Sequence, residues 1–188
     1  MTLYLLKRLS AVLAVCFLFA ACNASDTPKE AQAKEKPEPS TPAEFVEQAV
    51  FTDFDGNSVP ISNFKGKVVL IDFWETWCKP CLASFPTLQK LQKEFPENFV
   101  VLAVTPGFTD TVADAKDFAD EHNYDFIWLM DSNGLHKKLG VQGIPYKVFV
   151  DAEGNFIKKS MGTAGPQADY KKIKQIIEKH TDVKSDQT

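Results

Sequence analysis

Cys78 and Cys81 are the residues of this 188-residue chain whose type and spacing point most directly to chemistry. They follow a near-continuous apolar segment, 67–74, and Pro80 between them can occupy the first turn of a helix. At a helix start, unpaired backbone N–H groups and the helix dipole stabilise a thiolate, and a second thiol one turn inside can resolve a mixed disulfide. The pattern predicts a reversible dithiol/disulfide centre in which Cys78 is the nucleophile and Cys81 resolves, with the positive charge of Lys79 favouring the Cys78 thiolate.

Three other uses of the cysteine pair fit the sequence less well. A zinc site needs about four ligands, and His122, His136 and His180 are scattered with no second cysteine pair. Covalent haem attachment requires a histidine directly after the second cysteine, where Leu82 stands. A purely structural disulfide gains little closure entropy across so short a loop. We therefore expect neither a metal site nor a cofactor.

The segments around the pair predict an α/β domain. Strand-like runs at 67–74, 99–104 and 125–130 alternate with helical patterns at 82–95 and 109–122. This rhythm implies parallel strands covered by helices. Further elements are expected as an opening hairpin around 50–57, a short helix within 131–140, a second hairpin at 146–159 and a last helix over 167–180.

Composition limits the function classes. The formal charge is −4, with 21 Lys and Arg against 25 Asp and Glu, so no basic field favours nucleic acid and no nucleic-acid partner is expected. Four cysteines are too few for a disulfide-rich scaffold. We therefore expect a packed apolar core to stabilise the folded domain.

The N-terminus has the layout of a secretory signal peptide over residues 1–21, with Lys7-Arg8 before an uncharged run. The run ends in Phe19-Ala20-Ala21-Cys22, which resembles the lipobox of bacterial lipoproteins, although Phe19 stands where Leu is usual. Cys22 is thus expected to carry lipid; the alternative is a plain signal with Cys22 incidental. Residues 22–43, rich in Pro, Lys and Glu, are expected to form a disordered tether, and 184–188 a tail.

The motifs together resemble the thioredoxin superfamily. The matching residues are Asp72-Phe73-Trp74, Trp77-Cys78-Lys79-Pro80-Cys81, Pro86 and Gly143-Ile144-Pro145. The extra βα unit, the opening hairpin and the lipoprotein signal narrow the resemblance to TlpA/ResA-like membrane-tethered thiol-disulfide oxidoreductases, over about residues 44–183. It implies a thioredoxin-like fold, a central mixed sheet flanked by helices with an N-terminal hairpin and an extra βα insertion. It also implies reduction of disulfides outside the cytoplasm, often during cytochrome c maturation.

Several site residues are expected from this resemblance by position. Pro145 should be a cis-proline whose loop faces the cysteines, and the Ile144 backbone should pair with a bound substrate chain. Asp72 matches the buried acid that takes the proton of the resolving thiol, and burial would raise its pKa toward neutral pH. The alternative for Asp72 is a solvated position. Trp77, with Trp74, is expected to shape an apolar rim around the sulfurs.

Three residues depart from the family pattern. Glu75 stands where relatives carry a small residue; it could bridge to Lys79, raise the pKa of Cys78, or be solvated and inert. Ser84 stands where many relatives carry Glu, so any proton-handling role of that acid is absent or moved. Tyr146 follows the proline where Thr is common, which would change the lip of the substrate groove.

The combined hypothesis is a monomeric, lipid-anchored enzyme on the outer side of a bacterial membrane that reduces protein disulfides with electrons from a membrane donor of the thiol-disulfide interchange type. Lys79 and the helix start stabilise the reduced thiolate and so favour oxidation of substrates, whereas the charges of Asp72 and Glu75 oppose this. A function as a disulfide oxidant or isomerase therefore stays an alternative. A non-catalytic redox or copper-binding module would need further Cys, His or Met ligands near the pair, and none is found. A peroxiredoxin-type peroxidase would need Thr three residues before Cys78, where Glu75 stands.

Overall fold

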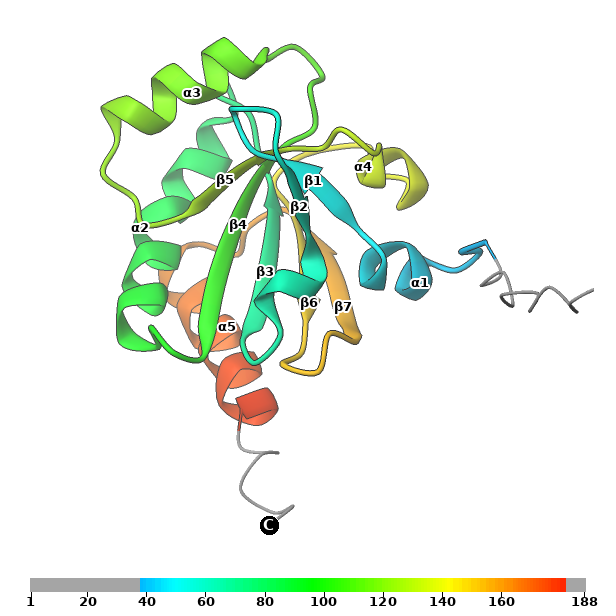
Figure 1. Cartoon of the computed structure of the whole chain (residues 1–188). Coiled ribbons are helices and arrows are strands. Elements are labelled where there is room, and N and C mark those ends of the chain that lie inside the picture. Colours follow the sequence, from blue (N-terminus) through cyan, green and yellow to red (C-terminus); the bar gives the residue numbers. More distant parts are fainter. Residues whose placement is uncertain (1–37, 182–188) are drawn as a thin grey trace, which may run out of the picture. The chain divides into compact units, whose positions relative to one another are not determined.

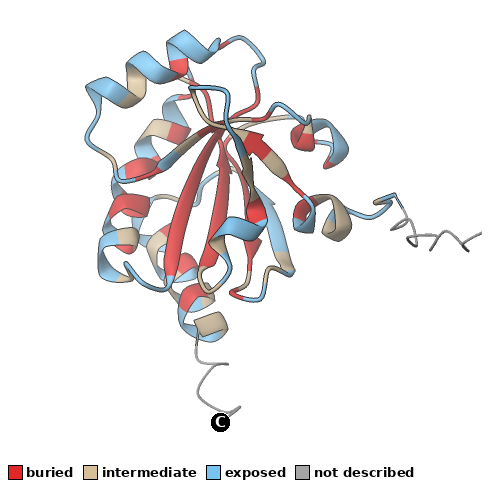
Figure 2. Ribbon diagram, viewed as in Figure 1, coloured by how far each residue is buried: buried red, intermediate tan, exposed pale blue. Residues whose placement is uncertain are grey.

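Apolar segments of the sequence form the parallel centre of a seven-stranded sheet in the computed structural model, which describes residues 38–181 (Figure 1). These central strands are β3 (Val68–Phe73), β4 (Phe99–Thr105) and β5 (Ile127–Met130). Every residue of β3 and β4 is buried, because helices cover both faces of the sheet, and this explains why both strands are apolar in sequence apart from Asp72 in β3 and Thr105 at the end of β4. Figure 2 shows this buried centre in red.

Two hairpins complete the sheet, in the strand order β2-β1-β5-β4-β3-β6-β7. The first joins β1 (Val50–Thr52) to β2 (Ser58–Pro60), and the second joins β6 (Tyr146–Val150) to β7 (Phe156–Met161). In the first turn the Asp53 carboxylate accepts the backbone N–H of Asn57 at 2.8 Å. Both hairpins were predicted, and β6 pairs antiparallel with β3, which makes the sheet mixed.

The helices lie in two layers. On one face α2 (Lys79–Glu94), α3 (Val112–Glu121) and α5 (Pro166–Thr181) cover an apolar cluster that includes both cysteines. On the other face α1 (Pro42–Glu47), α4 (Leu135–Lys138) and the short 3-10 helix η1 (Ile61–Phe64) cover a second cluster. Because side chains alternate along a strand, Leu70 enters the first cluster and Ile71 the second.

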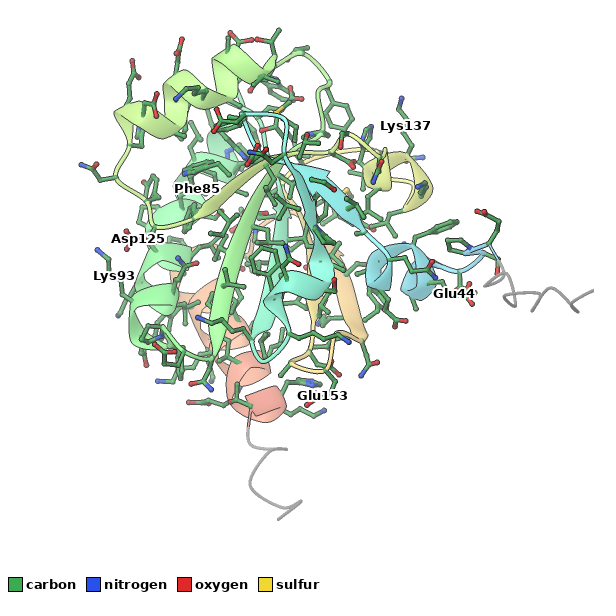
Figure 3. The ribbon with its side chains drawn as sticks, viewed as in Figure 1. Glu44, Phe85, Lys93, Asp125, Lys137 and Glu153 are labelled. Atoms are coloured by element: carbon green, nitrogen blue, oxygen red, sulfur yellow. A yellow bond between two sulfur atoms is a disulfide. The ribbon has the colours of Figure 1, made fainter. Side chains whose placement is uncertain are left out.

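An aromatic group in the first cluster fills the space between α2, α3 and β5. Phe85, labelled in Figure 3, lies fully buried at its centre, with ring centroids 5.3–6.2 Å from five other aromatic rings. The five are Trp74, Phe118, Tyr124, Phe126 and Trp128. These rings fix α2 against the sheet, and α2 carries the cysteine pair at its start.

An N-terminal helix that the sequence analysis did not predict precedes the first hairpin. We placed the start of the domain at residue 44, but α1 begins at Pro42. A capping box defines this start, because Glu44 N–H donates to Thr41 Oγ1 at 3.2 Å and Thr41 N–H donates to the Glu44 carboxylate at 2.9 Å. Residues 41–43, which we assigned to the tether, therefore belong to the fold.

The predicted signal peptide, the lipidation site Cys22, the tether as far as residue 37 and the tail at 184–188 lie outside the described residues. Within 38–181, no helix is both long and apolar enough to cross a membrane.

Candidate active site

Cys78 and Cys81 lie at the start of α2, directly after the central strand β3. Cys78 is the N-cap residue of the helix, and Cys81 is in its first turn. A disulfide joins them, and the Cys81 backbone N–H donates to Cys78 Sγ at 3.3 Å. A thiolate on Cys78 would thus receive a backbone N–H and lie at the positive end of a 16-residue helix, which stabilises its charge. This is the arrangement that the spacing predicted.

The loop before β6 contributes the proline that the resemblance indicated. The peptide bond between Ile144 and Pro145 is cis. Ile144 packs against both apolar clusters, including the one that contains the cysteines, and it precedes β6, whose first residue, Tyr146, pairs with Phe73. The Ile144 backbone therefore lies beyond the end of the β3–β6 ladder, next to the cluster with the sulfurs.

Asp72 is fully buried on the face of the sheet that α2 covers. The Nζ of Lys147 lies 3.3 Å from Asp72 Oδ1, and this lysine is also buried. The two groups form an ion pair without a well-directed hydrogen bond. Burial raises the pKa of the Asp72 carboxyl above its ordinary value, while the Lys147 ammonium acts to lower it. The alternative of a solvated Asp72 is wrong, and Lys147 was missed from the sequence.

Glu75 neither pairs with Lys79 nor lies in solvent. It is fully buried, and its carboxylate accepts hydrogen bonds from the β4–α3 loop and from the Trp77 indole N–H, which lies at 2.6 Å. The donors in the loop are Phe108 N–H, Thr109 N–H, Thr109 Oγ1 and Asp110 N–H. A salt bridge to Lys79 and a solvated, inert position are therefore both wrong, because Glu75 is fully buried and its carboxylate accepts from these donors instead. The effect of this negative charge on the pKa of Cys78 stays a prediction.

Asp110, in the same loop, accepts hydrogen bonds from the segment that contains Glu75. Its carboxylate accepts Thr76 N–H at 2.5 Å and the Thr76 hydroxyl at 3.0 Å. We call these reciprocal hydrogen bonds the carboxylate clamp, made by Glu75 and Asp110. The clamp fixes the segment before Cys78 to the loop after β4, on the side of the sheet where α2 begins.

Two aromatic rings attached to the clamp are exposed, Trp77 at 54% and Phe108 at 42%. The indole N–H of Trp77 and the backbone N–H of Phe108 both donate to Glu75, so the two residues flank one carboxylate. Trp74, which we had placed with Trp77 at the rim, is instead fully buried beside Phe85. Lys79 and Pro80 are exposed in the first turn of α2.

The other two departures from the family pattern lie away from the surface. Ser84 is buried and its hydroxyl donates to the Cys81 carbonyl at 2.7 Å. It therefore does not replace the carboxyl group that many relatives carry at this position. Tyr146 is 7% exposed and packs its ring against Phe73 in the cluster on the opposite face of the sheet. Our prediction that Tyr146 changes the groove lip is therefore wrong, because the strand directs this side chain into the core.

A redox-active disulfide at the N-terminus of a helix after the central strand, with a cis-proline before the neighbouring strand, defines a thioredoxin-like protein. Within the described residues, no group of three or more His, Cys, Asp or Glu side chains is arranged to hold a metal ion. The chain belongs to the AhpC/TSA family, whose sequence profile matches residues 41–159.

Two curated relatives show this likeness in detail. The chain is 35% identical over 111 residues to the thioredoxin-like protein YneN of Bacillus subtilis (strain 168), covering 57% of this chain and 64% of YneN. It is 32% identical to the thiol-disulfide oxidoreductase ResA of Bacillus thuringiensis subsp. konkukian, covering 60% of this chain and 65% of ResA. The chain thus spans just under two thirds of the length of these curated relatives.

Among solved structures, the pneumococcal exposed lipoprotein thioredoxin Etrx1 from Streptococcus pneumoniae strain TIGR4 is 33% identical. The superposition has a TM-score of 0.57 and covers 67% of this chain and 97% of the Etrx1 chain. The shared fold is therefore thioredoxin-like, as predicted.

Proposed function

We propose that this protein is a thiol-disulfide oxidoreductase that reduces protein disulfides through Cys78 and Cys81. The single observation that carries the proposal is the disulfide between the N-cap of α2 and its first turn. Cys78 Sγ lies at the positive end of the helix dipole, and Cys81 Sγ is bonded to it. ResA, a relative at 32% identity, is named for the same activity.

The reaction runs in two steps of thiol-disulfide exchange. In the reduced protein the Cys78 thiolate attacks one sulfur of a substrate disulfide, forms a mixed disulfide and expels the other substrate sulfur as a thiolate. Cys81 then loses its proton and attacks Cys78 Sγ, which expels the second substrate thiolate and leaves the protein oxidised. Two electrons pass to the substrate, and Asp72 is proposed to accept the Cys81 proton as a general base.

The surface around the pair supports a protein substrate. Trp77 and Phe108 expose aromatic rings beside the site and can pack against apolar side chains of a client protein. Ile144 is proposed to pair its backbone with an extended client segment, because it lies beyond the end of the strand ladder, and cis-Pro145 is proposed to shape the loop that faces the cysteines. Lys79 and the helix start would tune the Cys78 thiolate.

The location and partners belong to the proposal as well. We propose that the domain is anchored to the outer side of a bacterial membrane through lipid on Cys22, which fits the sequence of the leader and the relative Etrx1, described as an exposed lipoprotein. Electrons would come from a membrane donor of the thiol-disulfide interchange type. A role in cytochrome c maturation rests on the resemblance to TlpA/ResA-like proteins alone.

The proposal is tested by insulin reduction with dithiothreitol as electron source, using the full chain in detergent. Cys78→Ser is expected to abolish the activity, and Cys81→Ser to accumulate mixed disulfides that are visible by non-reducing electrophoresis and mass. Full activity in Cys78→Ser would overturn the assignment. Rapid consumption of peroxide with slow insulin reduction would point instead to a peroxidase, which we disfavour because Glu75, not Thr, stands three residues before Cys78.

A further inference from the structure

A pocket of about 250 Å³ lies between helix α5 and β7, the strand at one edge of the sheet (Figure 1). Its buried lining includes two apolar side chains, Phe149 on β6 and Ile173 on α5. Two exposed lysines also line it, Lys158 from β7 and Lys172 from α5. The pocket therefore combines apolar surface for a hydrocarbon stem with two cations that come from different elements.

The charges of the pocket favour an anionic group. In the part of the chain that the structure describes, neither Lys158 nor Lys172 forms an ion pair. The third lysine of the lining, Lys147, already forms an ion pair inside the sheet. The one carboxylate of the lining, Asp169, accepts from Thr163 Oγ1 and from a backbone N–H at 3.0 Å, so both of its oxygens have donors. The two exposed ammonium groups are therefore available to a carboxylate from outside the chain.

The loop that follows β7 joins this pocket to the cis-proline loop. The backbone N–H of Gly162 donates to the Pro145 carbonyl at 2.8 Å. Met161, which is 67% exposed, has its Sδ 3.7 Å from the position that a Cβ on Gly143 would take. Both Met161 and Gly162 line the pocket. A client segment at the cis-proline loop would thus lie next to the pocket.

The strand register gives the distance that a client must span. Ser160 lines the pocket and pairs with Lys147, which is three residues after Ile144. At about 3.3 Å per residue this separation is roughly 10 Å, the length of about three extended residues. Lys158 lies on the same face of β7 as Ser160, because side chains two residues apart in a strand point to the same side. An extended client can therefore reach the lysines with a side chain close in sequence to its cysteine.

We propose that Lys158 and Lys172 select clients that carry an Asp or Glu about three residues from the segment paired with Ile144, and that this carboxylate binds in the pocket between β7 and α5. The inference rests on the proposed function and names its substrate class. The exchange chemistry is unchanged, and the contact adds only an electrostatic preference. Because the whole chain has a formal charge of −4, it does not attract acidic clients at long range, so the preference depends on the position of the acid.

The experiment compares matched peptide disulfides in single turnovers of the reduced full chain in detergent. The peptides differ only in having Asp, Asn or Lys three residues before or after the cysteine, and the readout is the second-order rate constant of the first attack. The variants are Lys158→Gln, Lys172→Gln and the double substitution Lys158→Glu/Lys172→Glu. The matched control is Lys179→Gln, because Lys179 is an exposed lysine of α5 outside the pocket.

In the wild-type chain, the Asp peptide should react about three- to tenfold faster than the Asn peptide in one of the two positions, and the Lys peptide should be slowest. Lys158→Gln and Lys172→Gln should each reduce this ratio, whereas Lys179→Gln should keep it. Lys158→Glu/Lys172→Glu should make the Lys peptide the fastest, an inversion that a structural role of the lysines would not produce. All these ratios should approach one at about 1 M salt, where the Debye length is about 3 Å.

Equal rate constants for the Asp, Asn and Lys peptides in both positions would overturn the inference while leaving the proposed function intact. A preference for Asp that persists in Lys158→Glu/Lys172→Glu would also overturn it, because another part of the surface would then recognise the acid. Equal peptide rates, with binding to phosphatidylglycerol vesicles that this double substitution abolishes, would assign the lysines to a lipid surface instead. Failure of the proposed function looks different, since the wild-type chain would then reduce none of the peptides.

Discussion

Glu75→Ala should destabilise the oxidised protein more than its position in a loop suggests. The side chain is fully buried and accepts hydrogen bonds from the Trp77 indole and from the backbone of residues 108–110. Alanine would leave these donors facing the fully buried space that the Glu75 carboxylate occupies. The substitution tests whether the carboxylate clamp holds the segment before Cys78 in place.

The size of the effect follows from the number of donors. A hydrogen bond to a charged group contributes about 1.5–3 kcal/mol net, and each buried donor left unpaired costs about 1–3 kcal/mol. Two of the donors, Trp77 Nε1 and Thr109 Oγ1, are side chains that can turn toward water, which leaves the backbone N–H groups of the loop as the main loss. We therefore expect a loss of about 3–5 kcal/mol in the free energy of unfolding. Glu75→Gln keeps one acceptor oxygen and should lose about half as much.

The assay is equilibrium unfolding of the oxidised protein in urea, followed by far-UV circular dichroism. Glu97→Ala is the matched control, because Glu97 is exposed, and it should change the free energy of unfolding by no more than about 0.5 kcal/mol. The folded Glu75→Gln variant should also raise KM for insulin while its rate with a small aromatic disulfide stays at the wild-type value, because only a protein client contacts Trp77 and Phe108. A loss below about 1 kcal/mol in Glu75→Ala would refute the clamp.

Two further substitutions and one titration probe the frame that holds the site. Phe85→Ala should lower the free energy of unfolding by about 3–5 kcal/mol in urea, because it removes the ring at the centre of the aromatic group; a loss under about 1 kcal/mol would contradict that packing. Hydrogen bonds from Ser40 and Thr41 lower the pKa of Glu44 to about 2, so its stabilisation of α1 is present above the ordinary value of 4.5 and is lost as the pH falls through about 2. NMR titration of Glu44 checks this, and a midpoint near 4.5 would exclude the capping box. Thr111→Ala removes the N-cap of α3 and should cost about 1 kcal/mol, seen as faster amide exchange in that helix, whereas unchanged exchange would argue against the cap.

The sequence was sufficient for the elements that local patterns determine. β3 and β4 were predictable because strands buried on both faces are near-continuous apolar runs, and the start of α2 followed from the cysteine spacing and Pro80. Helix α1 was not predicted, although Thr41 and Glu44 have capping-box spacing, because the prolines of the segment directed the interpretation toward a tether.

Contacts between distant segments were not predictable from the sequence. Lys147 lies in a strand where a single lysine is typical of a solvent-facing position, and only the pairing register brings it opposite Asp72. The partners of Glu75 are mostly backbone N–H groups more than thirty residues away, which no side-chain pattern reveals. Tyr146 was misplaced because the residue after the cis-proline begins β6, and the alternation of the strand directs it into the opposite face.

The most direct test of the central claim is the reduction potential of the Cys78–Cys81 couple. The protein would be equilibrated in thiol redox buffers, quenched by alkylation, and both cysteines counted by peptide mass. We predict a single two-electron transition in which Cys78 and Cys81 change together, at a potential closer to the value of about −270 mV typical of thioredoxin than to the value of about −120 mV typical of a strong oxidant. A disulfide that shows no transition across the buffer range would contradict the account.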